Sequence, residues 1–195
     1  MRLFVLTRHA HSTLNVAGRV NGDPAVPVPL TDDGRAQARQ LGHQLAALEI
    51  DVCVQTRFAR TQDTAALVLE GRDVPRATEP LLDDIDIGEL EGASIGDYRA
   101  WKREHPRDEP FPGGESLDDA ARRYARAFRG LVERAEQTIL VVCHEIPIRY
   151  ALNAAAGSDD LDGPEHLIPN ATPYLFDEAA LARAAERIEQ ITCSR

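Results

Sequence analysis

The chain has 195 residues, 43% of them hydrophobic, and its formal net charge at pH 7 is -10. This length and this apolar content suit a single globular domain over residues 1–195 with a sizeable core. The net negative charge disfavours nonspecific binding to nucleic acid or to an anionic membrane surface, so an anionic ligand would need a local basic pocket.

The cysteines and the apolar runs indicate the cellular compartment of the protein. Cys53, Cys143 and Cys193 lie far apart and no apolar leader precedes them, which is typical of the reducing cytoplasm. No apolar run approaches the roughly 20 residues that a membrane-spanning helix needs. We expect a soluble cytoplasmic protein without a membrane partner, and the sequence leaves the oligomeric state open, a homodimer included.

Strands and helices alternate in the first part of the chain. Leu3 to Thr7 is a continuous apolar run, which is typical of a strand buried on both faces. Thr31 is expected to cap a helix that continues to about Leu48. Val52 to Gln55 predicts a second strand, and Thr56 is expected to cap a helix that ends at Gly71.

The alternation continues after two predicted loops over residues 23–29 and 106–114. Ser116 begins a helix, with Asp119 as a partial capping box. Thr138 to Cys143 is the clearest buried strand, and a helix is expected from about Pro147 to Ala156.

Two further segments have a helical pattern. Residues 178–187 are alanine-rich and amphipathic, which predicts a surface helix or helical turn. Tyr98 and Trp101 lie in a short helical stretch that could pack on the core or form part of a lid. Together, the elements predict an α/β fold: a three-layer sandwich with a mostly parallel central sheet and helices on both faces.

Basic and imidazole side chains follow three of the predicted strands. These are Arg8 with His9, the segment from Thr56 to Arg60, and His144. Ligands of such folds bind at the carboxyl ends of the strands. We therefore expect these groups to converge at one edge of the sheet.

Four fragments resemble one known family. They read Thr7-Arg8-His9-Ala10-His11-Ser12, Arg57 to Ala65, Pro112-Gly113-Gly114-Glu115-Ser116 and Val142-Cys143-His144-Glu145. Their order and spacing resemble the histidine phosphatase superfamily, in its phosphoglycerate mutase-like branch. The resemblance covers nearly the whole chain and implies a phosphoglycerate mutase-like fold and catalysis without a cofactor.

The resemblance also implies roles for five residues. His9 would be the nucleophile, Arg8, Arg60 and His144 would hold the transferring phosphoryl group, and Asn15 would border the pocket. Guanidinium forks stabilise the charge that the phosphoryl oxygens carry in the transition state. Imidazole is a competent nucleophile when one nitrogen is free and an acceptor holds the other. We expect His144 to act as an imidazolium, which a bound dianion would favour.

The general acid is where the sequence departs from the family. The family usually has Glu in a Leu-x-Glu-x-x-x-Gly stretch, and Asp84 aligns with that acid here. A positioned acid is worth roughly 10²- to 10⁴-fold in rate because the leaving oxygen needs a proton. Asp is one methylene shorter, so Asp83, Asp86 and Glu89 are fallback candidates.

Two other departures flank the nucleophile. Ala10 stands where the family prefers Gly, and His11 stands where Glu or Gln is common. Both are expected to alter pocket shape and substrate choice. His9 and His11 also have the His-x-His spacing of a metal pair in amidohydrolase-type barrels. Such a barrel needs about 250 residues, so we expect no metal.

A cysteine-based alternative comes from the spacing of Cys143 and Arg149, which is the Cys-x5-Arg spacing of cysteine-dependent phosphatases. That loop must aim successive backbone N–H groups at phosphate. Pro147 has no N–H, and no glycine eases the turn. We regard this alternative as the weaker one.

The leading hypothesis is a phosphomonoesterase that acts on a small phosphorylated metabolite through a phosphohistidine intermediate. A phosphoglycerate mutase-type transfer would use the same residues. Mutases of the family are usually longer, because extra segments close over the intermediate and exclude water. A phosphate-binding module without turnover is a third alternative, which the intact set of Arg8, His9, Arg60 and His144 argues against.

Overall fold

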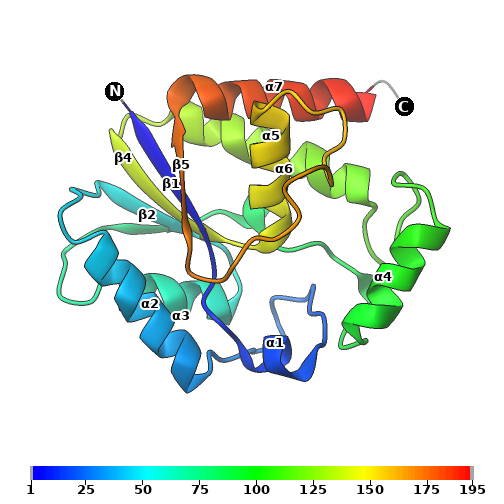
Figure 1. Ribbon diagram of the computed structural model, residues 1–195, viewed down its shortest axis with the longest axis horizontal. Helices are drawn as coiled ribbons and strands as arrows, with labels where there is room; N and C mark the ends of the chain where they lie inside the picture. The colour runs from blue at the N-terminus through cyan, green and yellow to red at the C-terminus, as the bar shows by residue number, and fades with distance from the viewer. Residues whose placement is uncertain (1, 194–195) are drawn as a thin grey trace.

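The computed structural model describes residues 2–193. Five strands form one sheet in the order β3-β2-β4-β1-β5 (Figure 1). The strands are β1 (Leu3–Arg8), β2 (Val52–Gln55), β3 (Arg76–Thr78), β4 (Thr138–Cys143) and β5 (Pro173–Asp177). The first four pair in parallel, and β5 pairs antiparallel with β1 at one edge. The predicted mostly parallel sheet is confirmed, although the sequence did not predict the two edge strands.

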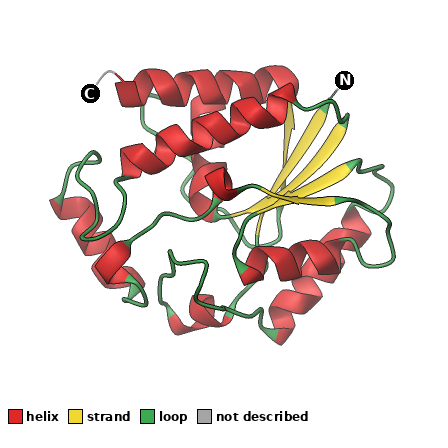
Figure 2. Ribbon diagram, turned by 180° about the vertical axis from the view of Figure 1, so that it is seen from behind, coloured by secondary structure: helices red, strands yellow, loops and turns green. Residues whose placement is uncertain are grey.

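Seven α-helices surround the sheet within the described residues. They are α1 (Thr13–Ala17), α2 (Asp32–Gln44), α3 (Ala59–Val68), α4 (Ile95–Glu104), α5 (Leu117–Glu133), α6 (Glu145–Ala155) and α7 (Glu178–Cys193). Figures 1 and 2 show α5, α6 and α7 on one face of the sheet and α2 and α3 on the other. The three-layer arrangement is therefore confirmed. None of these helices is both long and apolar enough to cross a membrane.

Strand side chains alternate between two apolar cores. Phe4 and Leu6 of β1 face the core under α5, α6 and α7, whereas Val5 faces the core under α2 and α3. The same alternation holds along β4, where Val141 and Leu140 belong to opposite cores. A strand with helices on both sides must be apolar on both faces, which is why its sequence is a continuous apolar run.

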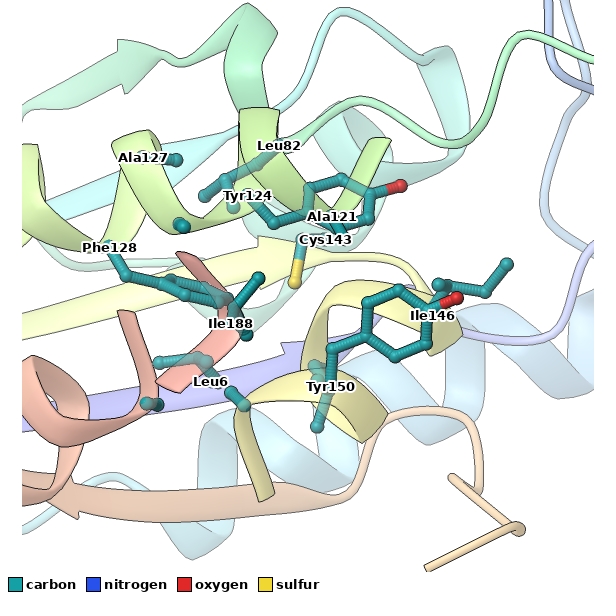
Figure 3. Close-up of a cluster of buried hydrophobic side chains, with 14 of the residues drawn as sticks. Leu6, Leu82, Ala121, Tyr124, Ala127, Phe128, Cys143, Ile146, Tyr150 and Ile188 are labelled. Carbon is teal, nitrogen blue, oxygen red and sulfur yellow. The ribbon is translucent and has the colours of Figure 1, made fainter. Parts of the chain in front are cut away.

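The side chain of Cys143 lies in the core under α5, α6 and α7. Figure 3 shows Tyr124 and Phe128 of α5, Tyr150 of α6 and Ile188 of α7 packed together on the sheet. The Cys143 sulfur lies among these side chains, and the residue is fully buried.

Several predicted helix boundaries are wrong for identifiable reasons. Thr56 does not cap α3, which begins at Ala59 with Phe58 as its N-cap. The Thr56 hydroxyl instead contacts Thr61 and the His144 ring. Helix α6 begins at Glu145, two residues before the expected start, because His144 is already its N-cap.

The last helix is amphipathic, as the sequence predicted, but it is longer than expected and packs closely on the core. Helix α7 continues to Cys193. One face of it, with Leu181, Ala184 and Ile188, is fully buried against α5 and α6. Alanine makes this close helix packing feasible because its side chain is small. Helix α2, in contrast, ends at Gln44, before the expected Leu48.

The carboxyl ends of β1, β2 and β4 meet at one side of the sheet. Figure 1 shows α1 and α4 outside the three layers on this side. The predicted helical stretch around Trp101 is α4, and Trp101 and Tyr98 both stack on Phe111, with ring centroids 4.1 and 5.6 Å apart. This stacking anchors α4 as a wall over the strand ends.

Candidate active site

His9 follows β1 directly and is held by the backbone on both sides. Its N–H donates to the Cys143 carbonyl at 2.9 Å, and its side chain is nearly inaccessible, with the residue 3% exposed. The ring Nδ1 lies 2.8 Å from the Ala10 carbonyl oxygen. Because a carbonyl only accepts, Nδ1 carries the proton and Nε2 keeps its lone pair. This is the tautomer that a nitrogen nucleophile needs.

The environment keeps the His9 ring neutral. Burial lowers its pKa well below the usual value, and the positive charges of Arg60 and Arg8 lower it further. The bond to the Ala10 carbonyl acts in the opposite direction. A free Nε2 lone pair is therefore present at neutral pH.

Arg60 connects the other expected groups. It is 4% exposed, and one guanidinium nitrogen lies 3.1 Å from the Asp84 carboxylate and 3.3 Å from Nδ1 of His144. A second nitrogen donates to the Asn21 side-chain oxygen. The planar guanidinium is thus fixed by three partners before any substrate binds.

His144 lies behind Arg60 and beside His9. Its ring centroid is 5.6 Å from that of His9, and it is fully buried. Burial is the main cause that lowers its pKa well below the usual value, and Arg60 adds to this effect. The protein alone therefore favours a neutral imidazole, and protonation by a bound dianion stays a prediction.

Arg8 is oriented by two acceptors. Its guanidinium donates to the Ile168 carbonyl at 2.9 Å and pairs with Glu145 at 2.8 Å. Both contacts come from segments remote in sequence, the loop before β5 and the start of α6.

Asp84, the expected general acid, lies beside Arg60 and His144. Its carboxylate oxygen lies 3.4 Å from Nδ1 of His144. Burial raises its pKa, and this effect outweighs the opposing charge of Arg60. A carboxyl group with a raised pKa retains its proton more readily, which suits general acid catalysis.

The fallback acids occupy other places. Asp83 binds the Arg57 guanidinium at 2.6 Å, and Asp86 caps its own turn by accepting from the Gly88 N–H at 3.0 Å. Within residues 2–193, neither of them nor Glu89 lines the cavity that contains His9.

A cavity of about 670 Å³ opens over these groups. Arg8, His9, Asn15, Arg60 and Asp84 all line it, so five of the six expected site residues share one surface. His144 does not reach this surface in the described part of the chain and contacts it through Arg60 and Asp84.

Asn15 reaches the cavity from a short capped helix. Its side-chain oxygen accepts from the Ser12 N–H and hydroxyl, both at 3.0 Å, which closes a capping box at α1. Its oxygen is therefore engaged in the cap, and its amide nitrogen carries the donors that remain for a ligand.

Among the polar residues of the cavity lining that sequence reasoning missed, three hold expected site groups. Asn21 holds Arg60, Glu145 holds Arg8, and the Asn170 amide donates to the His9 carbonyl at 2.7 Å. Glu145 adjoins His144 in sequence, which was the one available signal. Asn21 and Asn170 lie in loops, where only the tertiary structure shows their partners.

The two departures beside the nucleophile do not shape the cavity. The Ala10 side chain packs in the core under α2 and α3, and neither Ala10 nor His11 lines the cavity as described over residues 2–193. The cavity lining gives no support to a direct effect of these residues on pocket shape, and their effect on substrate choice stays a prediction. The His11 backbone bonds the side chains of Thr31 and Gln37.

The structure argues against the thiolate alternative. Cys143 points into the core (Figure 3), and burial raises the pKa of its thiol far above the usual range. A neutral, inaccessible thiol is a poor nucleophile. Arg149 does line the cavity, but it pairs with Glu145 and Asp162 at 3.2 and 3.0 Å.

Comparison with known proteins agrees with this geometry. The family model of the histidine phosphatase superfamily (branch 1) matches residues 4–188. The chain belongs to this superfamily. The match spans every strand of the sheet and all of the site residues described above, so the resemblance seen in the sequence is confirmed.

Relatives of this chain include enzymes of two kinds. A 2,3-bisphosphoglycerate-dependent phosphoglycerate mutase 2 from Gloeobacter violaceus is 35% identical over 78% of this chain and 74% of its own. Phosphoserine phosphatase 1 from Hydrogenobacter thermophilus is 31% identical over 80% and 76%. The crystal structure of the alpha-ribazole phosphatase from Shigella flexneri superimposes with a TM-score of 0.79 at 26% identity, covering 90% of both chains. The superfamily thus contains both phosphatases and mutases.

Proposed function

We propose that this histidine phosphatase is a cytoplasmic phosphomonoesterase that uses His9 as its nucleophile and a phosphohistidine as its intermediate. The observation that carries the proposal is the bond between Nδ1 of His9 and the Ala10 carbonyl, which leaves Nε2 with a lone pair. Arg8, Arg60 and Asp84 line the same cavity as His9 and supply the remaining groups that the reaction requires.

In the first step, Nε2 of His9 attacks phosphorus and forms an N–P bond while the bond to the ester oxygen breaks. Arg8 and Arg60 stabilise the negative charge on the phosphoryl oxygens. The leaving oxygen takes a proton from the Asp84 carboxyl group, whose raised pKa favours the protonated form.

In the second step, the Asp84 carboxylate accepts a proton from water as the water oxygen attacks phosphorus. The N–P bond breaks, its electron pair returns to Nε2, and inorganic phosphate leaves. Asp84 is protonated again, so the cycle balances without any other reactant.

An open cavity supports water, and not a second hydroxyl of the substrate, as the acceptor. Leu167 and Ile95 line the cavity and are 84% and 39% exposed. Water can therefore reach the intermediate from this side, whereas a mutase has to exclude it.

The test compares wild type with His9→Ala, using an aryl phosphate and a rapid quench at alkaline pH. We expect inorganic phosphate release and a phosphoryl adduct on His9 in the wild type. His9→Ala should lose both yet still bind orthophosphate through the arginines. The control is His43→Ala, because His43 is an exposed residue of α2 that does not line the cavity within the described range. Turnover by His9→Ala would refute the proposal, and isomerisation of phosphoglycerate without phosphate release would favour a mutase.

A further inference from the structure

The cavity over His9 is much larger than a phosphoryl group requires. Its volume is about 670 Å³, which lies within the range of roughly 300–1,000 Å³ typical of sites that enclose a whole organic ligand. The phosphoryl group itself is confined to the part near Arg8, His9 and Arg60. Most of the volume is therefore available to the organic part of a substrate.

Part of the wall of this remaining volume is apolar. Aliphatic side chains come to it from four separate segments: the N-terminal segment, the loop that carries Asp84, the start of α4, and the loop before β5. They include Leu14, Val28, Ile85, Ile87, Ile95 and Leu167. Aliphatic side chains from four segments thus offer an apolar surface to the organic part of a substrate, beside the charged groups of the same wall.

Two of these side chains are left exposed at the mouth. Leu167 is 84% exposed and Ile95 is 39% exposed. Leu167 belongs to the loop before β5, and Ile95 begins α4, the helix that stands outside the layers in Figure 1. An apolar group in the cavity would cover both side chains and remove their surface from water.

Besides Arg8 and Arg60, four cationic side chains line the cavity: Arg19, Arg99, Lys102 and Arg149. Lys102 and Arg149 lie 3.4 and 3.0 Å from the same Asp162 carboxylate oxygen, and Arg107 pairs with this carboxylate too, so only part of their charge is compensated. Arg19 and Arg99 make no ion pair within residues 2–193, but both are exposed, so solvent screens their attraction for an anion.

We propose that the leaving group of the substrate is a bulky apolar alcohol or phenol that fills this cavity, in preference to a short phosphorylated hydroxy acid. The proposal rests on the proposed phosphatase function, since the cavity holds the part of the ester that the reaction releases. It narrows the substrate class to aryl or longer-chain alkyl phosphate monoesters.

A series of ethyl, butyl and octyl phosphates tests the proposal on the wild-type protein. The three alcohols have similar acidity, so kcat/KM reports contact with the cavity and not leaving-group chemistry. We expect kcat/KM to rise about fourfold for each methylene group that becomes buried. A flat or falling trend, or a higher kcat/KM for 3-phosphoglycerate than for octyl phosphate, would overturn the proposal.

A matched pair of leucine variants locates the contact. In Leu167→Ser we expect the ratio of kcat/KM for octyl over ethyl phosphate to fall about three- to tenfold. Leu175→Ser is the control, because Leu175 is also exposed, at 65%, and does not line the cavity within the described residues. Equal ratios in the two variants would contradict an apolar contact at the mouth.

Binding of phosphonates separates this proposal from the proposed function. Alkyl phosphonates cannot be hydrolysed, so calorimetry with ethyl- and octylphosphonate measures affinity alone. Tighter binding of octylphosphonate without turnover of any ester supports the apolar cavity and contradicts the phosphatase function. Turnover of esters with equal binding of both phosphonates contradicts only the apolar leaving group.

Discussion

The hydroxyl of Thr56 lies 3.0 Å from Nε2 of His144 and 2.8 Å from the hydroxyl of Thr61. Thr61 in turn donates to the Phe58 carbonyl at 2.8 Å. The series of donors therefore runs from His144 through two threonines to the backbone. It assigns the proton of the neutral ring to Nε2 and leaves the Nδ1 lone pair facing Arg60.

Thr56 is accordingly expected to position His144. In Thr56→Val the ring N–H loses its buried acceptor, and an unsatisfied buried group costs about 1–3 kcal/mol, so kcat/KM should fall roughly tenfold or more. Thr56→Ser keeps the hydroxyl and should retain most of the activity. Nitrogen-15 chemical shifts of His144 check the tautomer independently, and a proton on Nδ1 in the wild type would contradict this assignment.

The contribution of Asp84 to kcat/KM should increase with the basicity of the leaving group. Asp84→Asn keeps an oxygen that can accept from Arg60 but cannot donate a proton as an acid. We expect kcat/KM for alkyl phosphates to fall roughly 10²- to 10⁴-fold, whereas a dinitrophenyl ester, whose leaving group needs no proton, should be affected much less. The check is the slope of log kcat/KM against leaving-group pKa. Equal losses for both classes would show that Asp84 acts only by holding Arg60.

The sequence predicted those elements of the fold whose formation depends on neighbouring residues in the chain. β2 and β4 have the predicted bounds, and β1 ends one residue beyond its predicted end, because strands buried on both faces must be continuously apolar. Ser116 caps α5 with the expected Asp119 box. β5 escaped prediction because it is an edge strand, with Leu175 exposed to solvent, and its pairing with β1 spans most of the chain.

The residues of the candidate site also fall into those that a local sequence signal predicts and those whose role depends on tertiary contacts. The sequence predicted His9 and Arg60 because they follow predicted strands in motifs of the family, and it predicted Asp84 because this residue aligns with the acid of a family motif. Asn170 could not be found, since its role depends on the loop before β5 reaching the His9 carbonyl, 161 residues away. Thr56 was misassigned because a threonine before a helix is usually its cap, whereas here its hydroxyl serves His144.

The loop that holds the nucleophile contains the only described residue other than glycine with a positive φ. Ala171 has a φ of 49°, and its N–H donates to the Arg8 carbonyl at 3.0 Å. The left-handed conformation costs a residue with a Cβ about 1 kcal/mol. Glycine relieves this strain but adds chain entropy, so the unfolding free energy of Ala171→Gly, measured by urea titration, should exceed that of a glycine substitution at an unstrained site by about 1 kcal/mol. In the control, Ala25→Gly, no such strain is relieved, and the added chain entropy should lower the free energy. Equal changes would contradict the argument.

The two buried imidazoles should make stability depend on pH on the acidic side. The pKa values of His9 and His144 lie well below 6.5 in the folded state, mainly through burial. Below pH 6.5 the unfolded chain therefore binds protons that the folded protein does not, and the unfolding free energy falls as the pH decreases. Each histidine contributes up to about 1.4 kcal/mol per pH unit.

His9→Gln should remove one such contribution when urea unfolding is compared between about pH 7.5 and about pH 5.5. The raised pKa of Asp84 contributes to the pH dependence of the unfolding free energy with the opposite sign. Because this contribution is present in both proteins, it largely cancels when they are compared. An unchanged slope in His9→Gln would mean that His9 binds its proton over the same pH range in the folded and unfolded states, which would contradict the lowered pKa.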